Sequence, residues 1–453
     1  MAIEVIAVFD IGKTNKKILL FDDGMQLVLQ EEEKFAEITD DEGFPCDDMD
    51  RIVSWMKDCL AGILKNGHFE IKALNFTTYG ATLMYLDANG NRLTPAYNYL
   101  KTMPEDVMEG FYEAYEGKEE FCRRTASPAL GMLNSGLQAL WLKIKKPEVF
   151  SRTKTVLHLP QYLSYCFTRQ LTSEYTSIGC HTAMWDFDNH SYHTWLIDKG
   201  ILPPQPVSNS TIFDIQIEGK QIIAGIGIHD SSASLVPYLK GTSEQFILIS
   251  TGTWCIFMNP FNTEPLTADQ LQRDTLCYMS IRQQQVKSSR LFMGHIHDVN
   301  VERLNKHFGV VSGHYKTIKA TGEKISRLVR NKQGRVFFRN GVPAEYIDKW
   351  VELSQFLTFA DAYQQLMSDL VDLSMESLNL ILAEDDRTQT VFISGGFSRN
   401  ELFVGLLAAR LPGKYVYTSA IDNASALGAA MVLREAAFGG EMPAIDLGLK
   451  KVE

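Results

Sequence analysis

The fold of this chain is decided by the stretch Asp10-Ile11-Gly12-Lys13-Thr14-Asn15-Lys16-Lys17, which joins two short apolar runs. Both runs, Ile3–Asp10 and Lys17–Phe21, have the length and composition of β-strands, so the polar residues between them predict a hairpin turn. A third strand is expected at Gln26–Glu31. Gly12 permits a tight turn and a close approach of the backbone to a ligand.

The polar residues of this turn can serve chemistry as well as structure. Thr14 and Asn15 can donate hydrogen bonds to phosphate oxygens, and Asp10 at the strand end can hold Mg²⁺ through water. An ordinary hairpin turn with a solvated basic edge would have the same composition. This stretch alone therefore leaves both interpretations open.

The strand–turn–strand pattern recurs past the middle of the chain. The apolar runs Phe246–Ser250 and Trp254–Met258 flank Thr251-Gly252-Thr253. Consecutive backbone N–H groups and hydroxyls in such a turn form a nest for an anion, and a polar turn between two core strands is the alternative. The repeat predicts two α/β halves with a cleft between them, joined near residues 236–245.

A third turn follows the strand expected at Thr390–Ser394 and precedes a helix expected at Glu401–Arg410. Its glycines, Gly395 and Gly396, can let a flat adenine lie against the backbone, and the helix start offers N–H donors. A generic glycine-rich connection between a strand and a helix is again the alternative.

The other periodicities predict alternating helices and strands, which is typical of an α/β protein. Residues 105–200 are expected to be mostly helical, whereas 264–350 has a clear pattern only at Val299–Phe308. Further helices are expected at Asp50–Lys65, Phe356–Ala383 and Asn423–Glu435, and further strands at Ala73–Thr77, Leu83–Leu86, Ser210–Ile228 and Tyr415–Thr418.

Composition excludes several classes of partner. The formal net charge of −11 argues against a broad surface for nucleic acid or anionic membranes. The longest uncharged run, 245–263, is too polar to span a bilayer. Scattered cysteines without a CxxC pattern predict reduced thiols, and residues 1–9 do not resemble a signal peptide. We therefore expect a cytoplasmic protein with no nucleic-acid or membrane partner.

Asp230 is the candidate general base. It follows a glycine-spaced apolar strand at Ile222–Ile228 and precedes a helix expected at Ser232–Tyr238. A carboxylate in this position can accept a proton from a substrate hydroxyl, and it can equally be the N-cap of the helix. The sequence has no P-loop or protein-kinase motif that would supply other machinery for phosphoryl transfer.

The order of these segments resembles the actin/hexokinase/Hsp70 superfamily and, within it, the FGGY family of carbohydrate kinases. Asp10–Lys17 resembles the family's D-x-G-T-T-x-x-K start, Ser394–Asn400 its G-G-x-S-R-N adenosine segment, and Asp422–Ala430 its closing E-A-x-A-L-G-A-A helix. Two residues depart from the family pattern. Lys13 stands where Thr is frequent, which adds a cation near the phosphates or points it to solvent, and Asn423 stands where an acidic residue is common.

The resemblance implies an α/β fold of two ribonuclease-H-like (actin-like ATPase) domains, with ATP and a sugar meeting in the interdomain cleft. The first domain would span 1–240 and hold the sugar and the first phosphate turn, and the second would span 241–453 and bind ATP. Mg²⁺ is expected near Asp10 and Asp230. The residues expected to bind ATP are Gly12, Lys13, Thr14, Asn15, Lys17, Thr251, Gly252, Thr253, Gly395, Gly396, Ser398 and Asn400.

The pair His229-Asp230 resembles the rhamnulokinase and fuculokinase branch of the family. Tyr79 and Gly80, with His181, lie in segments that resemble loops lining the family's sugar site, and core packing is the alternative for each of these side chains. The segment Gly294–Asp298, which contains two histidines, is expected to be a polar loop or a helix start rather than a metal site.

The resemblance implies an ATP-dependent carbohydrate kinase that phosphorylates a small ketose, either a 6-deoxy-ketohexulose such as L-fuculose or L-rhamnulose, or a pentulose. Transfer would be direct and in line, with Asp230 as the base. A glycerol or polyol kinase of the same family and a non-catalytic ATP-binding protein of the actin/Hsp70 kind are the alternatives. Members of the family are often dimers, so a homodimer is also an expectation.

Overall fold

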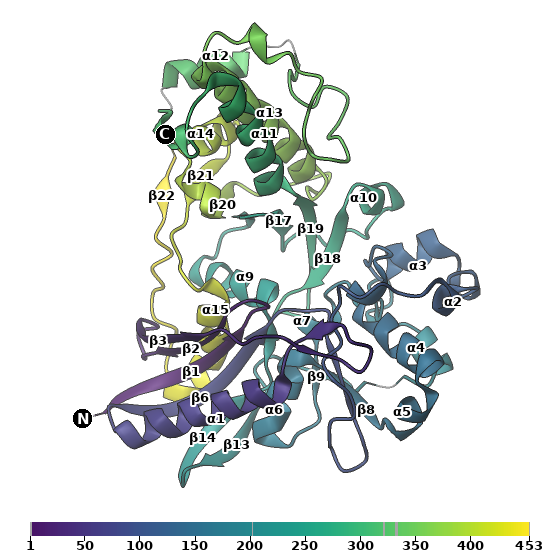
Figure 1. Cartoon of the computed structure of the whole chain (residues 1–453). Coiled ribbons are helices and arrows are strands. Elements are labelled where there is room, and N and C mark those ends of the chain that lie inside the picture. The colour runs from purple at the N-terminus through teal and green to yellow at the C-terminus, as the bar shows by residue number, and fades with distance from the viewer. Residues whose placement is uncertain (1, 202, 320–321, 331–333, 453) are drawn as a thin grey trace.

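The computed structural model describes residues 2–201, 203–319, 322–330 and 334–452, which form an α/β fold around two large β-sheets (Figure 1). The first sheet has the order β13 (Ile212–Ile217), β14 (Lys220–Gly225), β6 (Phe69–Thr78), β1 (Ile3–Ile11), β2 (Lys16–Phe21) and β3 (Leu27–Glu33), and β15 (Ile228–His229) pairs with β6. The second has the order β18 (Thr275–Met279), β19 (Gln285–Leu291), β17 (Cys255–Asn259), β16 (Phe246–Thr251), β20 (Thr390–Gly395), β21 (Tyr415–Thr418) and β22 (Lys450–Lys451).

The two sheets repeat one topology. In the first, β3, β2 and β1 form an antiparallel meander, and β6 then adds parallel to β1. In the second, β19, β17 and β16 form the corresponding meander, and β20 adds parallel to β16. The predicted hairpins and the internal repeat are therefore confirmed.

The predicted helices are confirmed, with bounds that shift by a few residues. Gly67 ends α1 in the left-handed conformation, which glycine adopts without strain. The helices are α1 (Met49–Asn66), α2 (Glu105–Met108), α3 (Lys118–Arg124), α4 (Ser135–Lys145), α5 (Pro147–Arg152), α6 (Leu159–Thr168), α7 (Tyr175–Ile178), α8 (Trp195–Asp198), α9 (Asp230–Gly241), α10 (Ala268–Gln272), α11 (Met293–Phe308), α12 (Gly322–Arg330), α13 (Phe359–Asn379), α14 (Glu401–Ala409) and α15 (Ala424–Phe438).

Short strand pairs complete the fold outside the two large sheets. They are β4 (Ile38–Thr39) with β5 (Pro45–Cys46), β7 (Leu83–Leu86) with β8 (Thr155–His158), β9 (Ser173–Glu174) with β12 (Pro206–Val207), and β10 (Trp185–Asp186) with β11 (Ser191–Tyr192).

Strand β1 is buried on both faces, and this places two layers of helices around the first sheet. Val5, Ala7 and Phe9 face a core shared with α1 and α6, whereas Ile6 and Val8 face α9 and α15. This alternation follows from the two-residue period of a strand. The long apolar run thus predicts a strand covered on both sides.

Helix α15 crosses back from the second sheet to pack on the first. It lies against α9, β6 and β1, although it follows the last long strand of the second sheet in sequence. A side-chain carbon at Gly428 would lie 1.9 Å from the carbonyl oxygen of Ala233, so the two helices touch backbone to backbone. The small residues of the closing helix are explained by this close contact.

Helix α9 is shared by both halves. Ala233 and Val236 pack toward the first sheet, and Leu235 and Tyr238 pack in a second core with Phe246 and other residues of the second sheet. Figure 1 shows α9 and α15 between the two sheets. Because Asp230 opens α9, the candidate base lies where the halves meet.

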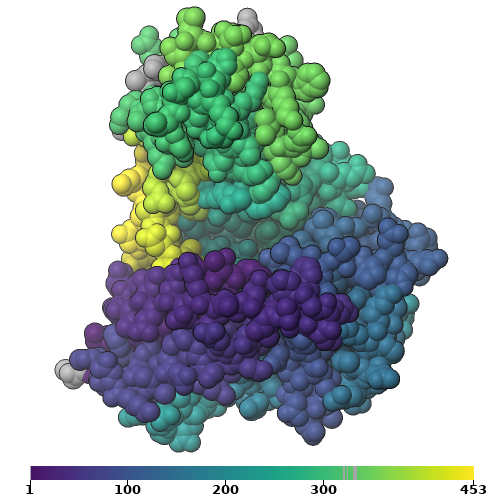
Figure 2. Space-filling model, in the orientation of Figure 1, coloured from purple at the N-terminus to yellow at the C-terminus, as the bar shows by residue number. Residues whose placement is uncertain are grey.

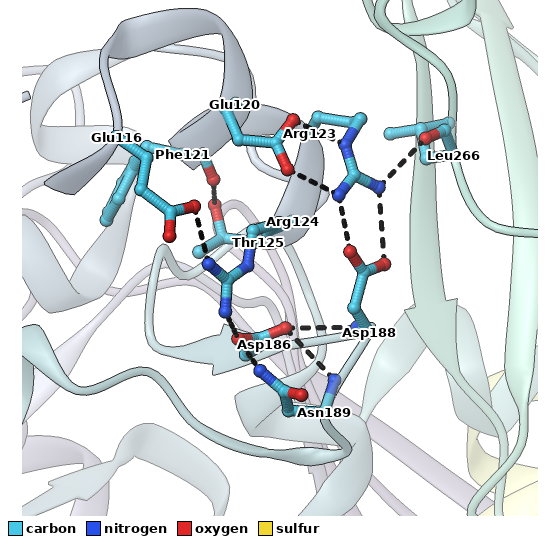
Figure 3. Close-up of polar contacts among 10 residues, drawn as sticks. All are labelled: Glu116, Glu120, Phe121, Arg123, Arg124, Thr125, Asp186, Asp188, Asn189 and Leu266. Atoms are coloured by element: carbon cyan, nitrogen blue, oxygen red, sulfur yellow. Dashed lines mark hydrogen bonds and ion pairs between the residues drawn. The ribbon is translucent and has the colours of Figure 1, made fainter.

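The middle segment also contacts the second half. One apolar core joins Phe121 and Trp195 to Leu266, Cys277 and Met279. Arg123 of α3 adds a polar link: it donates to the carbonyl oxygen of Leu266 at 3.3 Å while also pairing with Glu120 and Asp188 (Figure 3). The space-filling view shows a recess between the N-terminal segments and the helices of the second half (Figure 2).

Among the described residues, no helix is both long enough and apolar enough to cross a membrane. All seven cysteines are free thiols, as the sequence predicts.

Candidate active site

Three strands of the first sheet end at one edge and bring the two candidate carboxylates together. The parallel pairing sets Asp10 of β1 beside Thr77 of β6, and Thr77 beside Ile228 of β15. Since parallel strands present their carboxyl ends at the same edge, Asp10 and Asp230 meet there. Strand β6 lies between β1 and β15, so Thr77 stands between the two acids. Its hydroxyl is buried and has no hydrogen-bond partner in the described structure.

The two carboxyl groups are hard to ionise. Burial, followed by the charge of Asp230, raises the pKa of Asp10 to about 7, although Lys17 acts in the opposite direction. Burial raises the pKa of Asp230 to about 6, against hydrogen bonds from Ser231. Pairs of acids whose pKa values lie close to neutral pH are typical of catalytic sites and of sites that bind cations.

Only one of the two carboxylate oxygens of Asp230 accepts hydrogen bonds from described residues. Its Oδ1 accepts hydrogen bonds from the backbone N–H of Ser231 at 2.6 Å and from the Ser231 hydroxyl at 3.2 Å, and it lies 3.3 Å from Nε2 of His229. No described residue hydrogen-bonds Oδ2. A fixed carboxylate with one free oxygen is suited to take a proton from a bound hydroxyl.

His229 is a buried neutral imidazole beside the carboxylate. Burial lowers its pKa to about 4, and its Nε2 lies 3.3 Å from the Cys180 sulfur. Its Nδ1 is buried without a hydrogen-bond partner in the described structure. Gly80 is required here, because a side-chain carbon at this position would lie 2.9 Å from the His229 ring nitrogen.

His181 lies in the same region on the loop after α7. Burial lowers its pKa to about 3, with smaller contributions from the charges of His229 and Arg290, so it is also neutral. Its Nδ1 has no hydrogen-bond partner among the described residues. Two neutral histidines with unpaired ring nitrogens can donate to or accept from sugar hydroxyls.

Tyr79 and Lys13 meet at a carboxylate that the motif comparison does not include. The Tyr79 hydroxyl donates to Asp47 Oδ2 at 2.6 Å, and the Lys13 ammonium lies 3.0 Å from the same oxygen. Lys13 also pairs with Glu37 at 2.9 Å. The departure from the family pattern at Lys13 is thus accompanied by two acids that neutralise it.

The first turn is held by its own backbone and by α15. Gly12 donates to the carbonyl oxygen of Asn15 at 2.9 Å, and Thr14 is exposed at the tip. Lys17 donates to the side chain of Asn423 at 3.0 Å, which links the turn to the start of α15. Asn423 has a φ of 53°, in the left-handed region that asparagine tolerates better than most residues.

The second and third turns are joined to each other. Thr251 donates to the carbonyl oxygen of Ser394 at 2.5 Å and accepts from the N–H of Phe397 at 3.0 Å. Gly395 has a φ of 82°, and a side-chain carbon there would lie 1.9 Å from the carbonyl oxygen of Thr251. Only glycine fits this crossing, and Ser398 closes the turn by donating to Gly395 at 2.7 Å.

A cavity of roughly 590 Å³ opens beside these two turns. Four of the residues that line it are expected to bind ATP, namely Gly252, Thr253, Gly396 and Asn400. Others come from 294–319, which the motifs do not include. Asn400 caps α14 through Phe403 and donates to the Tyr363 hydroxyl at 3.0 Å, so its side chain is fixed. The cavity is lined by Gly252, Thr253, Gly294, His297, Asp298, Tyr315, Lys316, Ile318, Lys319, Gly396, Phe397, Arg399, Asn400 and Glu401.

These donors fit a nucleotide and its metal. The glycine turns and the N-terminus of α14 offer backbone N–H groups, which suit phosphates, and Tyr315 and Phe397 offer apolar faces beside them. Mg²⁺ is usually held by one or two carboxylates together with substrate phosphates, and Asp10 with Asp230 supplies such a pair. No cluster of three or more metal-ligating side chains occurs in the described ranges, and the segment Gly294–Asp298 begins α11 as expected.

Sequence reasoning missed several side chains of this region. Asp47 and Tyr99 come from loops that carry no motif, and Lys16 stands at an unspecified position of the first motif. Tyr99 lies 6.2 Å from Tyr79 between ring centres, and its pKa is raised by burial, with Lys13 and Asp230 among the charges that act on it. Only the sequence position of Tyr99, on a loop after β7, could have suggested that it lies near the site.

Comparison with known proteins gives the family. The N-terminal domain of the FGGY family of carbohydrate kinases matches residues 5–236. Rhamnulokinase of Oceanobacillus iheyensis is 25% identical over 268 residues, 54% of this chain and 54% of that protein, so the chain spans about half the length of the relatives that it matches.

Solved structures match along the whole chain. A carbohydrate kinase from Novosphingobium aromaticivorans is 21% identical, with a TM-score of 0.81 over 100% of this chain and 95% of that one. A ligand-bound xylulose kinase from Lactobacillus acidophilus is 16% identical, with a TM-score of 0.76 over 99% and 93%. The predicted α/β class and the two-domain actin-like ATPase fold are confirmed. Together with the matched N-terminal domain, this likeness shows that the chain belongs to the FGGY family of carbohydrate kinases.

Proposed function

We propose that this chain transfers the γ-phosphoryl group of ATP to a hydroxyl of a small ketose, with Asp230 as the general base. The observation that carries the proposal is the meeting of Asp10 and Asp230 at the edge formed by β1, β6 and β15. The cavity beside Gly252 and Gly396 supplies room for the nucleotide on the other side of the recess.

Asp230 would act on the acceptor hydroxyl. Its free Oδ2 accepts the hydroxyl proton as the oxygen attacks phosphorus, while its Oδ1 stays bound to Ser231. A base with a pKa of about 6 is ionised at neutral pH and still takes up a proton readily. Orienting the hydroxyl in line with the leaving oxygen contributes as much as removing its proton.

The turns would hold the phosphates. The turns at 12–14 and 251–253, with the cation of Lys17, are proposed to neutralise charge that develops on the transferred group, and Lys13, which pairs with Asp47 and Glu37, would hold the first turn in place. Asp10 and Asp230 would hold Mg²⁺, and the ion would supply positive charge next to the phosphates. Closure of the recess would exclude water and suppress hydrolysis of ATP.

A ketose is the proposed acceptor. His229 lies 3.3 Å from Oδ1 of Asp230, and Tyr79 and His181 lie on the neighbouring loops after β6 and α7; the unpaired ring nitrogens and the hydroxyl of these side chains suit an acceptor with several hydroxyls. Relatives named rhamnulokinase and xylulose kinase phosphorylate sugars of this class, which favours a 6-deoxy-ketohexulose or a pentulose. A glycerol or polyol kinase is the second candidate, since a glycerol kinase shares the fold.

The proposal includes the division of the molecule. Residues 1–240 would form the sugar-binding domain and 241–453 the ATP-binding domain, with α15 returning to the first. The chain is proposed to work in the cytoplasm, where ATP and reduced thiols occur together, and as a homodimer, as is frequent in the family.

A coupled assay for ADP tests the function. The purified chain is given ATP and Mg²⁺ with L-fuculose, L-rhamnulose, D- and L-ribulose, D- and L-xylulose or glycerol in turn. ADP release that depends on one ketose is expected, and Asp230→Asn should lower kcat by about 100- to 10,000-fold. ADP release that is independent of every acceptor, or full activity of the variant, would contradict the proposal.

A further inference from the structure

Asp47 is a buried carboxylate that belongs to none of the motifs. Its side chain is only 5% exposed, and it lies just before α1, whose N-cap is the next residue, Asp48. An antiparallel bridge between Asp47 and Ala96 fixes its backbone. The helix cap does not need this residue, so its burial and charge require another explanation.

Three donors from two functional elements converge on the Asp47 carboxylate. Lys16 donates to Oδ1 at 2.8 Å, while Lys13 at 3.0 Å and Tyr79 at 2.6 Å donate to Oδ2. Lys13 and Lys16 belong to the turn proposed to hold the phosphates. Tyr79 follows β6 on the loop proposed to hold the sugar.

Lys16 extends this contact to the backbone of the turn. Its side chain is 1% exposed, and its ammonium also donates to the carbonyl oxygen of Lys13 at 3.0 Å. Asp47 therefore fixes the course of the turn through Lys16 as well as the position of the Lys13 side chain. A carboxylate that is moved or removed would release all three donors together.

The network is balanced in charge, and the balance depends on Asp47. The cations of Lys13 and Lys16 are matched by the anions of Asp47 and Glu37. Glu37 reaches only Lys13 and is more exposed than Asp47, so it cannot replace the partner of buried Lys16. Removing one partner of a buried ion pair leaves the other uncompensated, and the loop must then rearrange.

Tyr79 is oriented by the same contact. Because its hydroxyl hydrogen is directed to Asp47, the Tyr79 oxygen can act toward any other group only as an acceptor. Its ring forms one side of a pair with Tyr99, and the Lys13 ammonium lies 5.8 Å from the centre of the Tyr79 ring. The phosphate turn and the sugar loop thus share one anchor.

We propose that Asp47 is a positioning residue that couples the nucleotide-binding turn to the sugar-binding loop, so that occupancy of one site favours binding at the other. This inference rests on the proposed function, and it extends it by assigning the link between the two substrates. The coupling is reciprocal: ATP should bind more tightly with the ketose present, and the ketose more tightly with nucleotide present.

The test compares Asp47→Asn with a matched control. Asp186 is a carboxylate of similar burial, with a 4% exposed side chain, and it pairs with Arg124 and Asn189 (Figure 3), with no hydrogen bond or ion pair to Asp10, Asp47 or Asp230 in the described structure. Asp186→Asn removes one charge from a buried ion pair in the same way. Both variants are expected to lose stability, so stability alone does not distinguish a coupling role from a structural one.

The first readout needs no ligand. Hydrogen–deuterium exchange of the free protein should accelerate at residues 11–17 and at 77–82 in Asp47→Asn, because both segments lose their anchor. In Asp186→Asn the acceleration should instead occur around 120–125 and 185–190. Unchanged exchange at 77–82 in Asp47→Asn would overturn the proposal, whether or not the chain proves to be a kinase.

The second readout is kinetic and uses the ketose found in the substrate panel. In the wild type, saturating ketose should lower KM for ATP. In Asp47→Asn the ratio of the KM for ATP at low ketose to that at saturating ketose should be about tenfold smaller than in the wild type, which is within the range usual for coupling between sites. Asp186→Asn should keep it.

Tyr79→Phe separates the ring from the hydroxyl. If Asp47 acts on the sugar through that hydroxyl, the changes in ketose KM caused by Tyr79→Phe and Asp47→Asn should not add. Strictly additive changes, or a wild-type coupling preserved in Asp47→Asn, would contradict the assignment. A wild type that phosphorylates no ketose would contradict the proposed function and leave the exchange experiment as the test of Asp47.

Discussion

Asp10 and Asp230 are acids whose pKa values, about 7 and about 6, lie near neutral pH because burial disfavours their charged forms. Each is therefore protonated at acid pH, where an ordinary surface aspartate would still be ionised. Protonated Asp230 cannot accept a proton, and protonated Asp10 is a poor ligand for a cation. In the proposed mechanism both effects would lower the rate at acid pH.

We expect kcat/KM for the ketose to rise with pH from about 5 to about 8 and then level off, because kcat/KM reports the ionisation of the two acids in the free protein. A profile of kcat/KM against pH, measured at subsaturating substrate, checks this expectation. Because the two groups interact, the profile reports apparent pKa values of the pair. Asp10→Asn should leave a profile with a single ionisation and a reduced plateau, whereas a flat wild-type profile would contradict the role of both acids.

At the scale of elements, the contact between α9 and α15 determines where Asp230 stands. Gly428 lies on α15 against the backbone of Ala233, one turn after the base. A methyl group cannot be accommodated there by a side-chain rotation, since the atom it meets is a carbonyl oxygen. The helices must move apart, and α9 carries Asp230 with it.

Gly428→Ala should therefore destabilise the protein by about 1–3 kcal/mol, the usual cost of overpacking, and lower kcat as well. Urea denaturation and the coupled assay measure the two effects. Gly405→Ala is the matched control, because a side-chain carbon at this helical glycine meets only the end of the flexible Ile325 side chain. The control should keep both stability and kcat, and equal losses in the two variants would contradict the argument.

Elements were largely predictable from sequence because their signals are local. The hairpin around Gly12, the strand before Gly395 and the helix stop at Gly67 each follow from periodicity and turn chemistry over a few residues. The meeting of Asp10 with Asp230 also follows, since the motif order fixes which strand ends share an edge.

The rest depends on contacts between distant segments, which a single sequence does not encode locally. In the sequence, Asp47 is one of several acids before a helix, and no neighbouring residue indicates that two lysines and a tyrosine surround it in the fold. The cavity residues from 294–319 lie in the stretch with the weakest periodicity. The return of α15 to the first sheet is likewise set by packing with α9, not by the local pattern of its small residues.

At the scale of the whole molecule, one face of the first sheet is covered in part by a helix from the second half of the chain. Ile6 and Val8 of β1 and Ala73 of β6 face Ala430 and Leu433 of α15. A piece that ends at Gly241 would expose this apolar face to water. Large exposed apolar faces promote association.

We expect a fragment of residues 1–241 to self-associate and to bind a hydrophobic dye, as measured by light scattering and dye fluorescence. Joining residues 420–441 to the fragment by a flexible glycine–serine linker should restore a monodisperse species, because α15 can then cover the sheet. A monodisperse fragment without α15 would show that the face is tolerated in water and would contradict the expectation.

The attachment of α3 to the segment around Leu266 has a mechanical consequence. Phe121, Cys277 and Met279 pack in one core, and Arg123 adds a hydrogen bond at its edge. These contacts oppose a displacement of α3 relative to the second half of the chain. A motion that separated α3 from Leu266 would expose this core to water and would leave Arg123 without the Leu266 carbonyl as a partner, so closure of the recess is expected to keep these contacts.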